Sequence, residues 1–455
     1  MTTPMQSWSF VIFAAAAVLL YYGLSWLVDK LKWPRKLLSL ALLVMSLGYF
    51  FAASLPEWAE RPGMALMRAA VLLVALCLYL WWIYIVGIMI DISESKRAKT
   101  IWLVLGVGTA LLLLFTFKTI DPIRKLTFAL LGMETAAFVS GSFLWIGVPL
   151  GISYFSFRAI HYIAEIYRGN GARATALEFF HYVTFFPTMV SGPIHRFYKI
   201  GREKPEDAFG RQMQLNGGAP RIGVEDINYG MWRLLQGLVK KFVLADFLFR
   251  LAGPMMKMPL MLGSSTGQLW LASHAYFAYL YVEFSGYSDI AIGLSRLMGY
   301  RVMENFSWPI LAPNLQEFWR RWHTSLTGWL MNYIYFPLGG GRKGNFRTDV
   351  NIMITIIAVA LWHKVNMSMF LWGFFEGLAL ITFRHWNRFK QRAFPNRKPT
   401  WWGRVIGIVM VWHVHGLLWP LFHHNFKIAL LYYVKMIPIL PLLTKGAGPA
   451  AGLGG

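Results

Sequence analysis

The stretch MALMRAAVLLVALCLYLWWIYIVGIMI at positions 64–90 decides the class of fold. Arg68 is its one charged residue, and the stretch is longer than the roughly 20 apolar residues that a helix needs to cross a bilayer. The whole chain of 455 residues agrees, because it is 56% hydrophobic and 14% charged, with a mean hydropathy of +0.46. Soluble domains are about 45–50% apolar and about 25% charged. We therefore predict an all-α polytopic membrane protein, in which each helix satisfies its own backbone hydrogen bonds.

Other apolar runs give the further candidate spans 8–28, 37–55, 100–117, 126–150, 174–191, 228–252, 266–283, 350–363, 367–383, 403–422 and 427–444. Two of these are poor spans, because 350–363 is short and 174–191 contains Glu178 and His181. Short or polar segments are tolerated at membrane depth only where they line a cavity or are buried in protein. We expect about eleven spans, with some segments re-entrant or interfacial.

The first apolar run, Phe10 to Val28, has no basic segment before it and no small-residue cleavage site after it. We expect a retained transmembrane helix there and not a signal peptide. The sequence shows no internal repeat and no change of composition that would indicate a second domain. We therefore predict one membrane domain over 1–444. The tail KGAGPAAGLGG at 445–455 is of low complexity and is predicted to be disordered.

The net charge is +23, from 44 Lys+Arg against 21 Asp+Glu. The basic residues gather in short clusters between apolar runs, namely Lys30, Lys32, Arg35 and Lys36; Lys96, Arg97 and Lys99; Arg342, Lys343 and Arg347; and 384–398. This is typical of cytoplasmic loops, whereas a nucleic-acid-binding protein gathers its basic residues on one exposed face. We therefore expect membrane lipid and no nucleic acid as a partner. A basic cytoplasmic face would also attract an anionic donor such as coenzyme A or an acidic carrier protein.

His363 follows a nearly uninterrupted apolar run in NIMITIIAVALWHKVN at 351–366. One interpretation is a histidine at a helix end in the headgroup region, with Lys364 extending to water beside it. The other is an imidazole in a partly dry site that acts as a general base near neutral pH.

His323 lies in EFWRRWHTSLTGWL at 317–330, within a region, 304–349, that is too polar to span and too aromatic for an ordinary loop. Interfacial or inserted amphipathic helices have this composition. If 315–336 is one helix, a single face carries Trp319, His323, Leu326, Thr327 and Leu330. That face belongs either to an interfacial aromatic belt or to the lining of a reaction channel, for which Trp322 and Asn332 are further candidates.

The segment LYVEFSGYSDIAIGLSRLMGYRVMENF at 280–306 is too polar for a helix that faces lipid. Small residues there permit close helix packing, but we favour a polar wall that faces the protein interior and includes Ser285 and Asp289. The remaining histidines carry weaker signals. Structural roles are expected for His161, His181, His195, His274 and His385. No metal site is predicted, since His413, His415, His423 and His424 have no Cys, Asp or Glu ligands nearby in the sequence.

Several of these stretches together resemble the membrane-bound O-acyltransferases, in particular the bacterial branch that acts in alginate O-acetylation and teichoic-acid D-alanylation. The resemblance is carried by VPLGISYFSFRAIHYIAEIYRG at 148–169, FPTMVSGPIHRF at 186–197, the block from FSGYSDIAIGL to YIYFPLGGGRKG at 284–344, LWHKVNMSMFLWGFFEGL at 361–378 and, more weakly, GLVKKFVLAD at 237–246. These stretches fall within 148–378, about half of the chain.

The resemblance implies a ring of transmembrane helices around a thinned centre with a tunnel through it. It also implies that His363, after Leu-Trp, and His323, after Arg-Arg-Trp, are the family's two catalytic histidines. The family transfers an acyl group from a cytosolic thioester to a hydroxyl outside or at the membrane, with extracytoplasmic partner proteins in the alginate branch. The donor would be acetyl-coenzyme A or an acyl-carrier thioester, with no bound cofactor, and the expected location is a bacterial inner membrane.

The chain departs from the family pattern at two positions. Lys364 replaces the glycine that usually follows LWH, and Glu376 replaces the histidine of the alginate branch's WG-x-x-HG motif. The alginate proteins also have a longer C-terminal region. Glu376 changes the local charge and proton balance, so it puts alginate itself in doubt as the substrate.

The predicted mechanism uses His363 to take the hydroxyl proton as that oxygen attacks the thioester carbonyl. His323 would position a substrate or stabilise charge, and Arg320, Arg321 and Lys364 would attract the donor. Three alternatives stay open: D-alanyl transfer from an acidic carrier protein, a transporter or flippase of lipid-linked sugars, and an inactive scaffold of a polysaccharide export complex.

Overall fold

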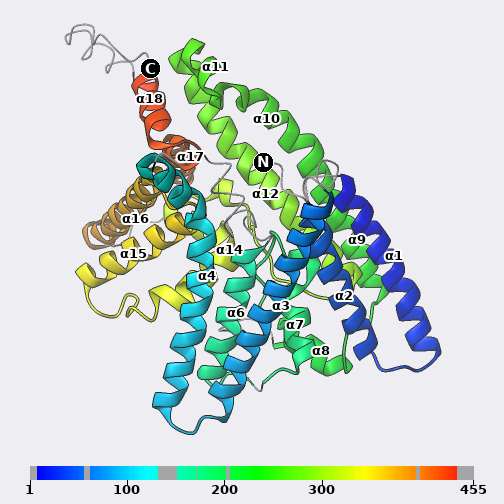
Figure 1. Cartoon of the computed structure of the whole chain (residues 1–455). Helices are drawn as coiled ribbons and strands as arrows, with labels where there is room; N and C mark the ends of the chain where they lie inside the picture. The colour runs from blue at the N-terminus through cyan, green and yellow to red at the C-terminus, as the bar shows by residue number, and fades with distance from the viewer. Residues whose placement is uncertain are drawn as a thin grey trace. The chain divides into compact units, whose positions relative to one another are not determined.

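The computed structural model describes residues 8–55, 62–131, 151–171, 173–200, 205–395 and 400–437, and within these ranges its regular elements are helices (Figure 1). The α-helices are α1 (Trp8–Lys30), α2 (Lys36–Ala53), α3 (Pro62–Ile92), α4 (Lys96–Leu131), α6 (Ile152–Tyr167), α7 (Ala176–Thr184), α8 (Phe209–Asn216), α9 (Val224–Val239), α10 (Asp246–Ala252), α11 (Met258–Gly263), α12 (Thr266–Leu297), α13 (Leu315–Arg321), α14 (Thr324–Leu330), α15 (Asn345–His363), α16 (Met367–Ala393), α17 (Trp401–His423) and α18 (Phe426–Met436). The all-α prediction is confirmed over these ranges.

Five helices are long and apolar enough to cross a bilayer: α1 from Phe10, α2, α3, α4 up to Thr119, and α17. The other predicted spans in the described residues are shorter or more polar, so the expectation of about eleven spans stays a prediction. The prediction for 174–191 is wrong, because α7 has only nine residues and a 3₁₀ turn that contains Pro187 follows it. Most of the candidate 126–150, the end of 427–444 and the tail 445–455 lie outside the described residues.

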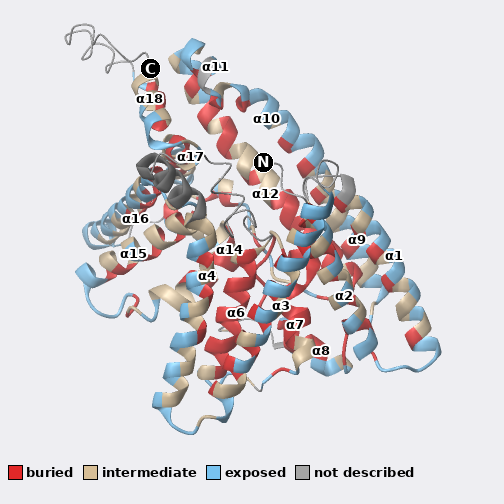
Figure 2. Cartoon of the chain, in the orientation of Figure 1, coloured by how far each residue is buried: buried red, intermediate tan, exposed pale blue. Residues whose placement is uncertain are grey.

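The chain forms two compact units, one of residues 1–237 with 287–304 and one of 238–286 with 305–455. In the first unit, α6 is buried along most of its length (Figure 2). Its fully buried Arg158 donates hydrogen bonds to the carbonyl oxygen of Val183 at 2.8 Å and to Oγ1 of Thr188 at 2.7 Å. A charge buried at this depth is stable only when the protein supplies such partners. These bonds fix the chain after α7 against α6.

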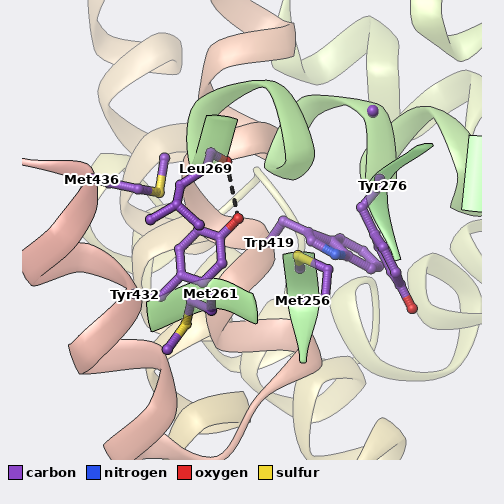
Figure 3. Packing of buried hydrophobic residues seen from close by; sticks show 9 residues of the cluster. Met256, Met261, Leu269, Tyr276, Trp419, Tyr432 and Met436 are labelled. Atoms are coloured by element: carbon purple, nitrogen blue, oxygen red, sulfur yellow. Dashed lines mark hydrogen bonds between the residues drawn. The ribbon is translucent and has the colours of Figure 1, made fainter. Parts of the chain in front are cut away.

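In the second unit, α15 and α16 form the most extensive helix pair, and α17 and α18 pack beside α16. An aromatic and methionine-rich core lies at one end of this unit, where Tyr432 donates a hydrogen bond to the carbonyl oxygen of Leu269 at 2.9 Å (Figure 3). Trp419 of α17 belongs to this core and packs against Tyr276 (Figure 3), with ring centroids 5.1 Å apart. The core therefore fixes the end of α17 that carries Trp419.

Gly373 lets α15 and α16 approach closely. A Cβ atom at this position would lie 2.7 Å from Cβ of Ala360 and 3.2 Å from Cα of Ile357, both parts of α15 that cannot swing away. Gly377, one turn further along α16, instead faces the flexible end of Met353, with its sulfur at 2.8 Å. The contact at Gly373 sets the position of the C-terminal half of α15, which ends at His363.

We expect Gly373→Ala to destabilise the protein by about 1–3 kcal/mol, the usual cost of overpacking a well-packed core. Gly377→Ala should cost less, because the Met353 side chain can move. Thermal unfolding of both variants in the same detergent measures the difference. Equal melting temperatures for the two variants would contradict the close contact at Gly373.

Candidate active site

A small cavity in the second unit brings together both histidines that the sequence singled out. Its volume is about 90 Å³, enough for a few water molecules or a group of similar size. The walls are mostly aromatic and apolar and come from helices α12 to α17; they are Phe277, Leu280, Phe284, Phe318, Trp319, Trp322, His323, Leu326, Val359, His363, Trp372, His415, Trp419 and Phe422. Imidazoles are the ionisable groups among these residues, which suits proton transfer in a site with little water.

His363 is the last residue of α15 and is held among aromatic rings. Its ring meets the edge of Phe422 with centroids 5.1 Å apart, and Phe422 stacks on Trp419 at 4.9 Å. Trp419 in turn belongs to the core shown in Figure 3. A continuous set of packed rings therefore connects the cavity to this core.

His323 does not lie within a helix, so the prediction of one helix over 315–336 is wrong. Helix α13 ends at Arg321, α14 begins at Thr324, and His323 between them has a left-handed backbone with φ of 44°. Residues other than glycine rarely adopt this conformation, and they retain it only where the surroundings enforce it. Here the backbone N–H of Thr324 donates to the carbonyl oxygen of Asn305 at 2.9 Å and thereby fixes the break.

Asn305 also fixes the tautomer of His323. Its Oδ1 accepts a hydrogen bond from Ser325 Oγ at 2.9 Å and lies 2.9 Å from Nδ1 of His323. Because an amide oxygen can only accept, Nδ1 carries the proton and Nε2 carries the lone pair. Among the described residues, Nε2 has no hydrogen-bond partner. Burial lowers the pKa of His323 to about 3, so the imidazole is a neutral hydrogen-bond acceptor at pH 7.

Glu376, another predicted lining residue, is fully buried beside the cavity. Its Oε1 accepts a hydrogen bond from the indole N–H of Trp319 at 2.8 Å, and Nε2 of His415 lies 3.7 Å from the same oxygen. A buried carboxylate is costly unless it is paired in this way. His415 thus enters the site as a cavity residue and as the partner of Glu376, a role that the sequence did not indicate.

A second, larger cavity of about 510 Å³ lies on the other side of Trp319 and Val359, which line both cavities. Three arginines, Arg320, Arg384 and Arg388, contribute to its wall. We call this cavity the basic vestibule. Arg384 and Arg388 are one helical turn apart on α16 and face the same side. Arg384 pairs with Asp349, and Arg388 donates a hydrogen bond to Asn345.

The other predicted site residues have diverse positions. Thr327 lines the basic vestibule, and Trp322 lines the small cavity. Three candidates line neither cavity: Ser285 donates to the carbonyl oxygen of Val282, Asn332 donates to that of Gly328 at 2.7 Å, and Asp289 pairs with Arg233 at 2.8 Å within the first unit. Arg320 and Arg321 pair with Glu317, and Lys364 is an exposed residue at the end of α15.

The sequence model of the membrane-bound O-acyltransferase (MBOAT) family matches residues 109–423, which include both histidines and both cavities. The chain belongs to this family. It is therefore an integral membrane protein, as its hydropathy predicted. The residues that line the two cavities all belong to one compact unit of the chain.

Relatives with curated descriptions belong to three related groups. The chain is 36% identical over 303 residues to the probable alginate O-acetylase AlgI of Pseudomonas putida, a match that covers 66% of this chain and 58% of that protein. It is 27% identical over 364 residues to a peptidoglycan O-acetyltransferase of Helicobacter pylori, covering 74% of this chain and 65% of that protein. A teichoic acid D-alanyltransferase of Streptococcus thermophilus is 28% identical over 292 residues, which cover 60% of this chain and 68% of that protein. The chain thus spans less than two thirds of the length of the AlgI protein that it matches.

The low pKa of His323 predicts a pH dependence of stability. The unfolded imidazole has a pKa of about 6.5, whereas the folded one has a pKa of about 3, so below pH 6.5 the unfolded chain binds a proton that the folded chain excludes. The stability that the folded protein gains by keeping His323 neutral is fully present above about pH 6.5. It is lost progressively as the pH falls toward 3. Between pH 7 and pH 5 the loss amounts to about 2 kcal/mol.

We expect His323→Asn to reduce the loss of stability between pH 7 and pH 5 by about 2 kcal/mol, because asparagine tolerates the left-handed backbone and can donate to Asn305 but does not titrate. Other histidines with lowered pKa values, such as His181, keep the remainder of the slope. Chemical unfolding of both proteins in detergent at pH 7 and pH 5 measures the difference. A wild-type slope that persists unchanged in the variant would show that His323 is not the titrating group.

Proposed function

We propose that this protein transfers an acetyl or other small acyl group from a cytosolic thioester to a hydroxyl at the outer side of the membrane. The observation that carries the proposal is one small cavity lined by three imidazoles, which shares the wall residues Trp319 and Val359 with a larger basic cavity. The basic vestibule suits the phosphates of coenzyme A or an acidic carrier protein. The small cavity suits the acyl group, the attacking hydroxyl and little else.

The basic residues of the second unit support an orientation. Arg347 at the start of α15, Arg384 and Arg388 near the end of α16 and Arg404 at the start of α17 lie at the same helix ends, and His363 lies at the opposite end of α15. Under the positive-inside rule the arginine end faces the cytoplasm. The donor then enters from the cytoplasm and the acceptor approaches from the outside.

We assign the general base to His363 and the orientation of the hydroxyl to His323. The neutral Nε2 of His323 accepts a hydrogen bond from a neighbouring, non-reacting hydroxyl of the acceptor and so orients the reacting hydroxyl toward His363. His363 then removes the proton as the oxygen attacks the thioester carbonyl. The carbon–sulfur bond breaks, the thiolate leaves, and the proton on His363 returns to it as a thiol, so the enzyme ends in its starting state.

The names of the relatives indicate the class of acceptor. Polysaccharide O-acetylation is supported by the match to the probable alginate O-acetylase and to the peptidoglycan O-acetyltransferase. We therefore propose a hydroxyl of an extracytoplasmic polysaccharide, reached directly or through an extracytoplasmic acyltransferase of the same complex. D-alanyl transfer is the alternative that the teichoic acid relative supports, and a D-alanyl carrier protein offered as donor distinguishes the two.

We expect His363→Ala to lower turnover by about 10²–10⁴-fold, the usual contribution of a positioned base. His323→Asn should also lower turnover while leaving the fold intact. The measurement is thiol release from acetyl-coenzyme A by purified protein with polysaccharide acceptors, beside the control His413→Asn, which changes an exposed histidine of α17 outside both cavities. Equal thiol release by all four proteins would place the base elsewhere, and no release from any thioester would favour the transporter or scaffold alternatives.

The basic vestibule predicts a separate effect on donor affinity. Arg388→Ser should raise KM for acetyl-coenzyme A by about tenfold with little change in kcat, because one charge-assisted hydrogen bond of about 1.5 kcal/mol is lost. Arg392→Ser is the matched control, since Arg392 lies on the next turn of α16 but lines neither cavity. An equal KM for both variants would show that the donor does not use the vestibule.

A further inference from the structure

We infer that Trp319, held in place by Glu376 and His415, limits the size of the acyl group that reaches the two catalytic histidines. The inference deepens the proposed function, because it assumes that the basic vestibule is the side from which the acyl group enters. It assigns a positioning role to the Glu376–His415 pair and a specificity role to the indole. Each step follows from the contacts of these three side chains.

The indole of Trp319 stands between the two cavities. Trp319 and Val359 are the residues that line both of them. The ring is packed edge-on against Phe318, with centroids 5.6 Å apart, and against Trp372 at 6.3 Å. On the proposed route, a group that moves directly from the vestibule of about 510 Å³ to the cavity of about 90 Å³ crosses the wall that Trp319 and Val359 form.

Glu376 fixes the orientation of that indole. The hydrogen bond from Trp319 Nε1 to Glu376 Oε1 is 2.8 Å long, and the carboxylate is fully buried. An apolar side chain of similar size would fill the same space without the cost of burying a charge, and such replacements are often neutral or stabilising. Stability alone therefore does not account for a carboxylate here, whereas a fixed Trp319 does.

His415 completes the pair. Its Nδ1–H donates to the carbonyl oxygen of Val411 at 2.9 Å, which leaves Nε2 as the atom that faces Oε1 of Glu376 at 3.7 Å. The ring is confined between Phe277, parallel at 5.1 Å, and Phe318, at 3.8 Å. Glu376 and His415 are thus held next to each other in apolar surroundings.

The consequence is a steep preference for short acyl groups. The cavity beyond Trp319 has room for a few waters or a group of comparable size. An added methylene that a rigid pocket does not accommodate lowers kcat/KM by about 10–200-fold. Release of Trp319 from Glu376 should relax this preference, because the indole can then rotate aside.

The first test measures thiol release from acetyl-, propionyl-, butyryl- and hexanoyl-coenzyme A. In wild type we expect kcat/KM to fall by about tenfold or more for each added methylene. Trp319→Ala and Glu376→Leu should flatten this series, whereas Glu376→Gln, which still offers an oxygen to the indole, should retain most of it. The His413→Asn control should match wild type. A chain-length series that is unchanged in Trp319→Ala would overturn the inference.

The second test does not depend on turnover, so it separates this inference from the proposed function. Cys77 is the only cysteine of the chain, and Cys77→Ser gives a background without thiols. In that background, Leu326→Cys places a thiol on the wall of the small cavity, where its modification by methyl and benzyl methanethiosulfonate can be timed by mass spectrometry. We expect the methyl reagent to react at least about tenfold faster, and we expect Trp319→Ala or Glu376→Leu to remove most of that difference. Equal rates for the two reagents with Trp319 intact would overturn the inference even if no thioester were ever consumed.

Discussion

Polar groups that are withdrawn from water must find partners inside the protein. This constraint determines how the key side chains of both units are placed. Arg158 is tolerated at zero exposure because carbonyl oxygens surround its guanidinium. The same requirement accounts for His323, whose ring and backbone are both tied to Asn305, and for Glu376, which is paired with an indole and an imidazole. Apolar burial makes the helices pack, but these polar contacts determine which side chain points where.

The fold class and the two central histidines could be predicted from the sequence, because each has a local signal. Long apolar runs predicted α1 to α4 and α17, and the patterns around His323 and His363 predicted two residues that the structure brings to one cavity. The basic run 384–398 also carried a signal, since Arg384 and Arg388 recur at helical spacing. Its composition is typical of a cytoplasmic loop, but the residues up to Ala393 extend α16. Arg384 and Arg388 of this extension line the vestibule.

Other features depended on contacts that no local pattern reports. The interruption at His323 is invisible in the helical periodicity of 315–336, because it is enforced by Asn305, which lies 18 residues away along the chain. His415 carried no signal for the site, since its relation to Glu376 exists only after α16 and α17 have packed. The prediction for 174–191 was wrong because apolar composition was weighed above Pro187, which stops α7 from continuing.

The position of Trp319 between two cavities also affects how well the membrane holds back protons and small ions. Any route that lets an acyl group cross offers the same route to protons and small ions, and a potential of 100 mV drives each elementary charge with about 2.3 kcal/mol. On the proposed route, a large ring that is fixed by a buried carboxylate narrows the passage to the size of a short acyl group without a moving gate. The same indole that excludes long acyl chains would thus let a cell keep its membrane potential while group transfer continues through its membrane.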